Sequence, residues 1–242
     1  TLTEVGSLIF DGTAVAEYMS LPYGTHVMDA FTYTATTAQG GEAEATVDMM
    51  ICGDVKSLDD IKMMLSGTVD FLITDNLSTG DAFSITTNSA DNPLLNVTDS
   101  DNVWCIDLEG DVDTNLTLTA NVFVADPSDA GLSDYLFNVD NLDLVNYILN
   151  QDFRSQGYTG NEIQDAIWFL TDGAGTIFQP NVYAIVEDAF NNGEGFEAGE
   201  GDIVGLILAP IQDTDPDTGA DVTNYQNFIY GVEYDVLADC LC

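Results

Sequence analysis

The chain has 242 residues, of which 45% are hydrophobic, and it carries three Lys and Arg residues against 42 Asp and Glu residues, for a formal net charge of −39. A surface with so few cations cannot neutralise phosphate groups, which excludes nucleic acids and anionic membrane surfaces as partners. The apolar runs are too short to cross a bilayer, so we expect no membrane insertion. The charge repulsion must be offset by high salt, as in a halophilic protein, or by bound divalent cations.

Short runs of alternating apolar and polar residues recur along the first hundred residues, separated by clusters of Gly, Asn, Asp and Ser. Evenly spaced strands of this kind are typical of a sandwich, so we expect an N-terminal β-sandwich domain over residues 1–100. One helix should interrupt the strands, because Ser57 can cap a turn in which Leu58, Ile61 and Leu65 share one face. The expected strands cover residues 7–18, 30–36, 46–51, 69–73 and 82–86.

A polar, turn-rich segment at residues 89–102 predicts the boundary to a second domain over residues 103–242. This domain should begin with a strand at VWCIDL, followed by a strictly alternating strand over residues 116–124. Three helices and two apolar strands complete the pattern. The predicted fold is therefore mainly β with a small helical subdomain. The two closing strands are expected at 202–210 and 228–234.

The middle one of the three helices has the clearest start and stop signals. Thr159 is a good N-cap, Glu162 lies three residues later, and Gly173 can end the helix. Each helix also has an apolar stripe for packing against the sheet. The stripes consist of Leu142, Val145, Ile148 and Leu149; of Ile163, Ala166, Ile167 and Leu170; and of Val182, Ile185, Val186, Ala189 and Phe190.

Residues for classical catalysis are scarce. His26 is the single histidine, and the chain has no Gly-x-Ser-x-Gly sequence around a nucleophile. We therefore predict that the protein is not an enzyme. Four cysteines fit an extracellular protein with disulfides, and the start at Thr1 fits a mature chain from which a signal peptide has been removed. We expect an extracellular or cell-surface location.

Two acidic loops are candidates for binding calcium. Alternate carboxylates in an irregular loop can converge on one hard cation with oxygen ligands. In DTDPDTGAD the ligands would come from Asp213, Asp215, Asp217 and Asp221. In DLEGDVDTN they would be Asp107, Asp111 and Asp113, unless this segment is a hairpin turn with solvated charges.

Two disulfides would also account for the four cysteines. On a strand, Cys240 and Cys242 would present both sulfurs on one face. They could then bridge Cys52 and Cys105, tying the C-terminus to both halves of the chain. On this reading Gln164 is a polar residue beside the core stripe of its helix.

The motifs WCID and QDAIW, read together, resemble the thioester domains of bacterial surface adhesins over about residues 103–235. Cys105 follows an aromatic residue as the family's cysteine does, and Gln164 begins the QxAIW element, although Ile163 stands where the family usually has threonine. The resemblance implies a bond between the Cys105 and Gln164 side chains, formed with loss of ammonia, that can capture a nucleophile on a host surface. Trp168 lies four residues from Gln164 on the same helix face and could cover such a bond.

Two function hypotheses follow. The first is a non-enzymatic, calcium-stabilised structural protein, a subunit of a surface filament, sheath or layer that assembles as a homopolymer. The N-terminal run of residues 1–18 would add as a strand to the next subunit's sheet, or form an edge strand of its own domain. The alternative is a cell-surface adhesin or ligand-binding module, with or without the Cys105–Gln164 thioester.

Overall fold

The computed structural model describes residues 15–22, 25–36, 40–53, 57–65, 67–75, 83–89, 92, 95–98, 100, 103–108, 110–114, 116–129, 131–173, 178–211 and 224–234. The chain divides into two compact units. The smaller comprises residues 1–56 together with 238–242, and the larger comprises residues 57–237. Each unit is described by itself below.

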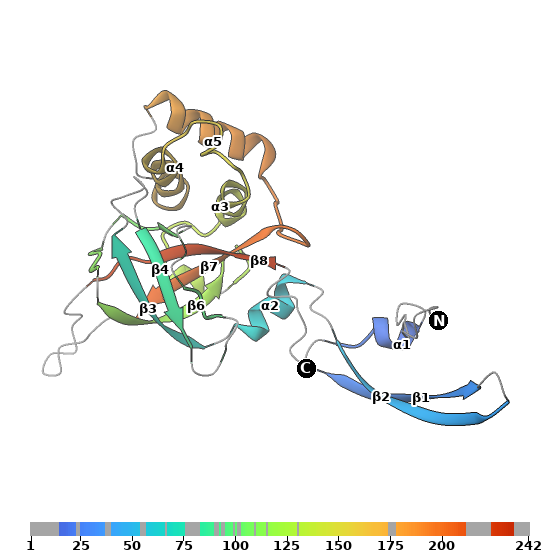
Figure 1. Cartoon of the computed structure of the whole chain (residues 1–242). Coiled ribbons are helices and arrows are strands. Elements are labelled where there is room, and N and C mark those ends of the chain that lie inside the picture. Colours follow the sequence, from blue (N-terminus) through green and yellow to red (C-terminus); the bar gives the residue numbers. More distant parts are fainter. Residues whose placement is uncertain are drawn as a thin grey trace, which may run out of the picture. The chain divides into compact units, whose positions relative to one another are not determined.

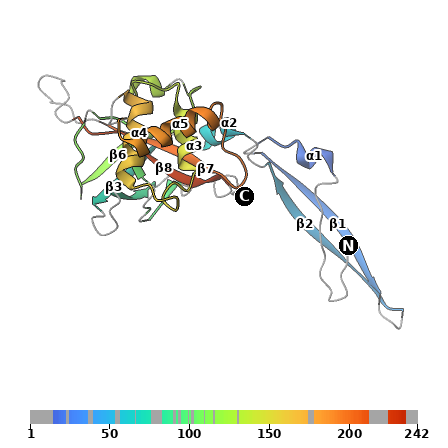
Figure 2. The ribbon, with the colours of Figure 1, turned by 90° about the horizontal axis from the view of Figure 1, so that it is seen from above.

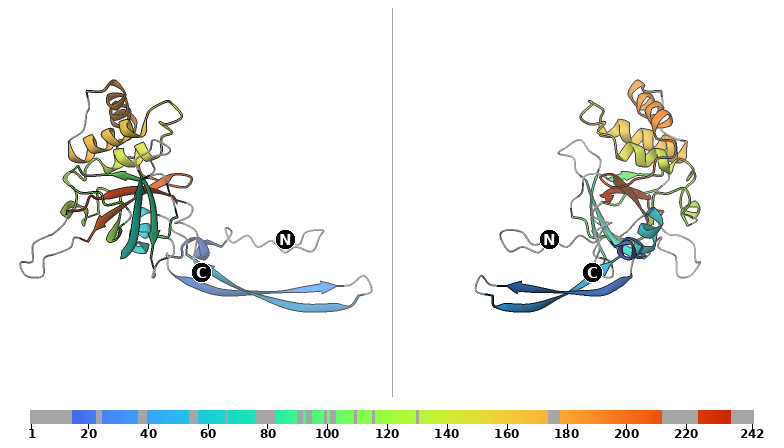
Figure 3. Two further views of the ribbon diagram at one scale, coloured as in Figure 1. Left: turned by 60° about the vertical axis from the view of Figure 1, so that its left-hand side comes forward. Right: turned by 90° about the vertical axis from the view of Figure 1, so that its right-hand side faces the viewer.

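The smaller unit contains a long two-stranded antiparallel ribbon (Figure 3). Strand β1 (His26–Thr36) pairs with β2 (Glu42–Cys52) over all eleven positions. A short helix, α1 (Ala16–Met19), precedes it. The strands expected at 30–36 and 46–51 are therefore present, and their side chains are exposed or half-buried.

The larger unit is built on one six-stranded antiparallel sheet with the order β4-β3-β6-β7-β8-β5. Strands from before and after the predicted boundary therefore share this sheet, and the segment at 89–102 lies inside the unit. The strands expected at 30–36, 46–51, 69–73 and 82–86 are thus divided between the ribbon and this sheet rather than forming a sandwich of their own. The strand expected at 7–18 lies outside the described residues as far as residue 14, and its residues 16–18 belong to helix α1 instead. The strands of the sheet are β3 (Thr68–Asp75), β4 (Phe83–Asn88), β5 (Val103–Cys105), β6 (Thr117–Val124), β7 (Ile203–Pro210) and β8 (Phe228–Glu233).

Helices α3, α4 and α5 form a layer on one face of β7 and β8 (Figure 1), and the view from above shows them lying over these strands (Figure 2). The mainly β fold with a small helical subdomain is confirmed. The helices of the larger unit are α2 (Leu58–Met64), the 3-10 helix η3 (Leu132–Asp134), α3 (Leu142–Leu149), α4 (Gly160–Asp172) and α5 (Pro180–Asn192).

Strand alternation gives the sheet two apolar faces. On one face Trp104, Ile207 and Ile229 pack in a core with the apolar stripes of α3, α4 and α5. On the other face the sheet curls, so that Phe71 of β3 packs edge-on against Phe228 of β8, with ring centroids 5.9 Å apart. An isolated antiparallel β-bridge between Ile85 of β4 and Ser100 brings one edge strand of the sheet next to the segment that leads into β5, the other edge strand. Both faces of β5, β7 and β8 are therefore buried.

Helix α4 begins and ends as its sequence predicts. The Thr159 hydroxyl accepts a hydrogen bond from the Glu162 N–H, and the Glu162 carboxylate accepts one from the Thr159 N–H at 2.8 Å, which completes the capping box. Gly173 ends the helix with φ of 64°, a conformation that costs glycine little. These local signals fix the position of α4 along the chain and hence which residues it presents to the sheet.

Two side-chain amides, the buried Asn146 and the half-buried Asn150, attach α3 to β7. The Asn150 carboxamide donates to the Ile203 carbonyl at 2.8 Å and accepts from the Ile203 N–H at 2.7 Å. One turn earlier, the Asn146 oxygen accepts from the Gly205 N–H at 2.9 Å. A Cβ on Gly205 would lie 2.7 Å from that oxygen, so this close approach requires glycine. The helical layer is thus held on the sheet by hydrogen bonds as well as by apolar contact.

Candidate cross-link site at the edge of β5

Strand β5 is an edge strand of the sheet. It pairs with β8 on one side, where Trp104 lies opposite Ile229 and Cys105 opposite Phe228. The next bond along this pairing runs from the Ile106 N–H to the Asn227 carbonyl, at 3.0 Å. In an antiparallel pair, alternate residues direct their N–H and C=O groups away from the partner strand. The backbone groups of Cys105 therefore face the open edge of the sheet.

Gln164 of α4 binds both of these groups. The Cys105 N–H donates to the Gln164 Oε1 at 2.9 Å, and the Gln164 Nε2 donates to the Cys105 carbonyl at 2.6 Å. Both residues are buried, with exposed fractions of 2% for Cys105 and 5% for Gln164. The carboxamide thus lies against the backbone of the residue that carries the thiol.

Two further residues on the same face of α4 continue this contact. Trp168 donates its indole N–H to the Asp107 carbonyl at 2.9 Å, and Asp172 accepts from the Leu108 N–H at 2.6 Å. We call this set of contacts, between Gln164, Trp168 and Asp172 and the backbone of residues 105–108, the α4–β5 seam. Its three helix residues are spaced i, i+4 and i+8, so one face of the helix runs along the edge of the sheet.

The Cys105 thiol lies in an environment that disfavours its ionisation. Burial, and to a smaller extent the negative charge of Asp107, raise the pKa of the thiol to about 12. The Asp107 carboxylate is itself held in place, because its Oδ2 accepts from the Asn227 N–H at 2.9 Å and from the Asn227 side chain at 2.7 Å. The thiol is therefore neutral at physiological pH.

The cysteines are placed differently from the predicted disulfide pairing. Cys105 is a free, buried thiol, so the bridge expected at this residue is not formed. Cys52 is bonded in a disulfide whose partner is not among the described residues. Cys240 and Cys242 lie outside those residues, as do Asp213, Asp215, Asp217 and Asp221 of the first predicted calcium loop.

The described residues of the second acidic loop do not form a cluster of ligands. Asp107 is directed to Asn227, and Asp111 uses its backbone to pair with residues 224–226, while Asp111 and Asp113 expose their side chains. Across the described part of the chain, no three His, Cys, Asp or Glu residues lie close enough to share a metal ion. Calcium binding at the first loop stays a prediction. His26 is exposed at the start of β1 in the smaller unit.

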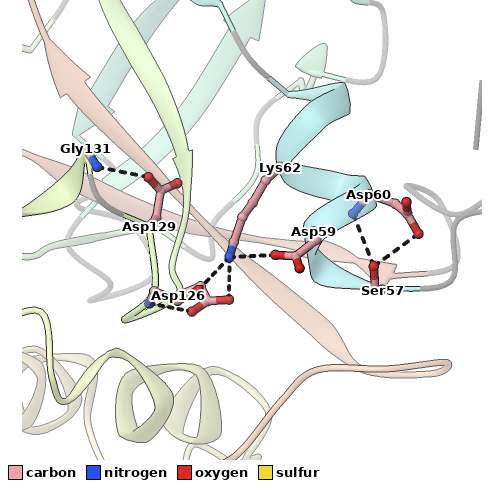
Figure 4. Close-up of polar contacts among 8 residues, drawn as sticks. Ser57, Asp59, Asp60, Lys62, Asp126, Asp129 and Gly131 are labelled. Carbon is pink, nitrogen blue, oxygen red and sulfur yellow. Dashed lines mark hydrogen bonds and ion pairs between the residues drawn. The ribbon is translucent and has the colours of Figure 1, made fainter.

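The described residues contain one well-developed ion-pair cluster, which attaches α2 to the turn after β6 (Figure 4). The Lys62 ammonium lies 2.8 Å from the Asp126 carboxylate and 3.2 Å from that of Asp59, and it donates to the Ser128 hydroxyl at 2.8 Å. Burial alone would lower the pKa of Lys62, but the hydrogen bonds and charges of Asp126 and Asp59 outweigh it and raise the pKa. Lys62 is thus a structural cation in an anionic protein.

Two solved structures are similar to the chain. The first is the N-terminal thioester domain of a surface protein from Clostridium perfringens, with 16% identity and a TM-score of 0.41 over 69% of this chain and 100% of that one. The second is a cysteine-to-alanine variant of such a domain from the same organism, with 14% identity and a TM-score of 0.43 over 68% of this chain and 99% of that one. No family model and no curated protein matches the sequence. None of the helices within the described residues is long and apolar enough to span a membrane.

Proposed function

We propose that the protein is an extracellular surface module that captures a ligand covalently through a thioester between Cys105 and Gln164. The observation that carries this proposal is the pair of hydrogen bonds between the Gln164 carboxamide and the Cys105 backbone. The sulfur of Cys105 is two bonds from the Cα of that residue. The contact of the carboxamide is with the backbone of Cys105, so formation of the bond requires the Cys105 and Gln164 side chains to turn toward each other.

The chemistry balances without an oxidant or a cofactor. The Cys105 sulfur attacks the Gln164 Cδ, the carboxamide nitrogen leaves as ammonia with the thiol proton, and a C–S bond replaces the C–N bond. An amine on the ligand then attacks the same carbon. The sulfur leaves as a thiol with the proton of the amine, and an amide joins Gln164 to the ligand. The capture occurs once per chain, so the module is a binding protein rather than an enzyme.

The surroundings of the pair support a bond that must be kept from water. The thiol and the carboxamide are buried, and Trp168 lies next along the seam, held by the Asp107 carbonyl. A thioester is activated relative to the amide that it replaces, and exclusion of water prevents its hydrolysis. The raised pKa of Cys105 means that the sulfur is a good leaving group only when it departs with a proton.

A purely structural role for Gln164 is the competing explanation. Asn150 makes the same two bonds to the backbone of Ile203, where no thiol is present, and its role is to attach α3 to β7. Asn150 therefore provides a matched control. A variant at either amide removes a side chain that bonds both the N–H and the C=O of one residue, but only the Gln164 variant removes the proposed electrophile.

The test is uptake of methylamine by the folded chain. The protein, Cys105→Ala, Gln164→Ala and Asn150→Ala are incubated with methylamine, and incorporated amine and released thiol are measured together. We expect one amine and one thiol per chain in the parent and in Asn150→Ala, and neither in the other two variants. Absence of uptake by the parent chain, or uptake that persists in Cys105→Ala, would contradict the proposal.

The filament hypothesis keeps one supporting observation. Within the described residues the β1–β2 ribbon has two strands, an arrangement that in isolation is marginally stable, and ribbon edges can pair with another chain. Its residues Met28 and Met50 are exposed, with 66% and 49% of their surfaces accessible. Particle size with calcium and high salt, compared with chelator and low salt, tests assembly. A monomer under both conditions would remove the homopolymer, the strand addition and the stabilisation of assemblies by calcium.

A further inference from the structure

A pocket of about 390 Å³ lies on the helix side of the sheet, beside the cross-link site. Trp104 and Ile163 both line it, and these residues immediately precede Cys105 and Gln164. The remaining wall comes from the end of α3, the turn after it and the start of β7. A volume in this range is sufficient for one large side chain of a partner protein.

The indole of Trp104 already carries a cation. The guanidinium carbon of Arg154 lies 5.2 Å from the ring centroid, within the range of a cation–π contact. Arg154 also lines the pocket and is exposed, whereas Trp104 is 2% exposed. The arginine therefore covers the indole from the solvent side and shows that this ring face accepts a positive charge.

The remaining lining has two parts that suit a long cationic side chain. Ile148, Leu149 and Ile203 supply aliphatic surface for a methylene stem. Asp152 and Asp202 supply carboxylates for a charged head group, and each uses one carboxylate oxygen for a local backbone bond, to Ser155 and Gly199 respectively. Arg154 is the one basic residue in this lining.

We propose that this pocket binds a lysine or arginine side chain of the captured ligand, separate from the group that reacts with the thioester. The methylene stem of the side chain lies along the aliphatic surface defined above. Its charged head group contacts Asp152, Asp202 and the face of the Trp104 ring, from which it displaces Arg154. The charge of the protein favours such a ligand, because a net charge of −39 attracts cationic segments. The identification of the partner as a captured ligand rests on the proposed function; the cation site itself does not.

The experiment uses the Cys105→Ala chain, in which no thioester can form, labelled with fluorotryptophan for fluorine NMR. The probes are N-acetyl-lysine amide and its uncharged analogue N-acetyl-norleucine amide. We expect a saturable shift of the Trp104 resonance with the lysine probe, and binding about tenfold weaker for the norleucine probe. The Trp168 resonance reports any general effect of added cation and should not move.

Three variants decide where the cation sits. Asp152→Asn and Asp202→Asn should each weaken lysine-probe binding several-fold, and the exposed position of Asp152 makes its variant safe for folding. Arg154→Gln should strengthen binding, because the probe no longer displaces a resident cation. Equal shifts with both probes, no shift of Trp104, or weaker binding in Arg154→Gln would overturn the inference. Failure of amine uptake in the parent chain would overturn the thioester and leave this result unaffected.

Discussion

Gln164 and Cys105 are 59 positions apart in the chain, yet each hydrogen-bonding group of the Gln164 carboxamide is bonded to the backbone of Cys105. The carboxamide occupies the place that a neighbouring strand would take at the edge of the sheet. It therefore satisfies two buried backbone groups and at the same time lies against the backbone of the residue that carries the thiol. The predictions below separate these two roles.

Removal of the carboxamide should destabilise the larger unit. Compared with the chain in which the Gln164 carboxamide is intact and no thioester has formed, Gln164→Ala leaves the N–H and C=O of Cys105 buried without partners, at a cost of about 2–4 kcal/mol in the free energy of unfolding. Asn150→Ala should cost less, because the two backbone groups that it leaves on Ile203 are only half-buried and can be hydrated. Urea denaturation measures both. A Gln164→Ala chain as stable as its parent would show that the seam contributes little to folding.

The Cys105 thiol should react slowly while the chain is folded. Its pKa of about 12 leaves almost no thiolate at pH 8, and its sulfur is buried. In the methylamine-treated chain, alkylation by iodoacetamide should become rapid only after denaturation. The rate is followed by mass, and Cys105→Ala corrects for labelling elsewhere. Rapid alkylation of the folded chain would contradict the burial of this residue.

Stability should also fall at alkaline pH once the thiol is free. The pKa of Cys105 in the folded chain, about 12, is higher than its ordinary value of 9.0, so the folded state holds the proton more tightly. The resulting stabilisation is complete below pH 9 and is lost as the pH rises from 9 towards 12. Urea denaturation at pH 8 and at pH 10.5 measures the effect. Between these two pH values the free energy of unfolding should fall more for the amine-treated chain than for the Cys105→Ala chain. Parallel losses would contradict this assignment.

The capping box of α4 should contribute to the stability of the larger unit. Thr159→Ala removes the acceptor for the Glu162 N–H and should lower the free energy of unfolding by about 1 kcal/mol. In a double-mutant cycle, the losses in free energy of unfolding caused by Thr159→Ala and Glu162→Ala should not add, because each side chain bonds the backbone of the other residue. Urea denaturation of the four chains supplies the cycle. Strict additivity would mean that the two bonds act independently.

The Lys62 cluster provides a comparison between a half-buried and an exposed partner. The side chain of Asp126 is 20% exposed and that of Asp59 is 84% exposed, while both contact the same ammonium. Asp126→Asn should therefore cost about 1 kcal/mol and Asp59→Asn only a few tenths of that, with both effects reduced by salt. Thermal and urea unfolding at low and high salt measure the difference. Equal effects would show that burial does not determine the strength of these pairs.

The sequence predicted the parts of the fold that local signals determine. Thr159, Glu162 and Gly173 determine where α4 begins and ends, and the structure confirms each role. The alternating runs also predicted most strands. Alternation does not say which strand pairs with which, however, so the same pattern described a ribbon at 26–52 and sheet strands at 68–88. A turn-rich segment at 89–102 resembled a domain boundary although it connects two strands of one sheet.

The same limit applies to the site. Cys105 and Gln164 were predicted together from short motifs, and the structure places them in contact. Asp172 and Asn227 were missed, although the i, i+4, i+8 spacing of Gln164, Trp168 and Asp172 was a usable signal for the first of them. Asn227 gave no such signal, because it reaches Asp107 from 120 positions away through the pairing of β5 with β8. Contacts that depend on sheet topology cannot be derived from local patterns.

The intact mass of the purified chain tests the central claim most directly. The mass is measured after denaturation without reducing agent, for the parent chain and for Gln164→Ala, and is corrected for hydrogens lost to disulfides. We predict that the parent is lighter than its sequence by one ammonia, that methylamine treatment replaces the deficit with an excess of one methylene group, and that Gln164→Ala shows neither change. A parent mass that disulfides alone explain would contradict a thioester between Cys105 and Gln164.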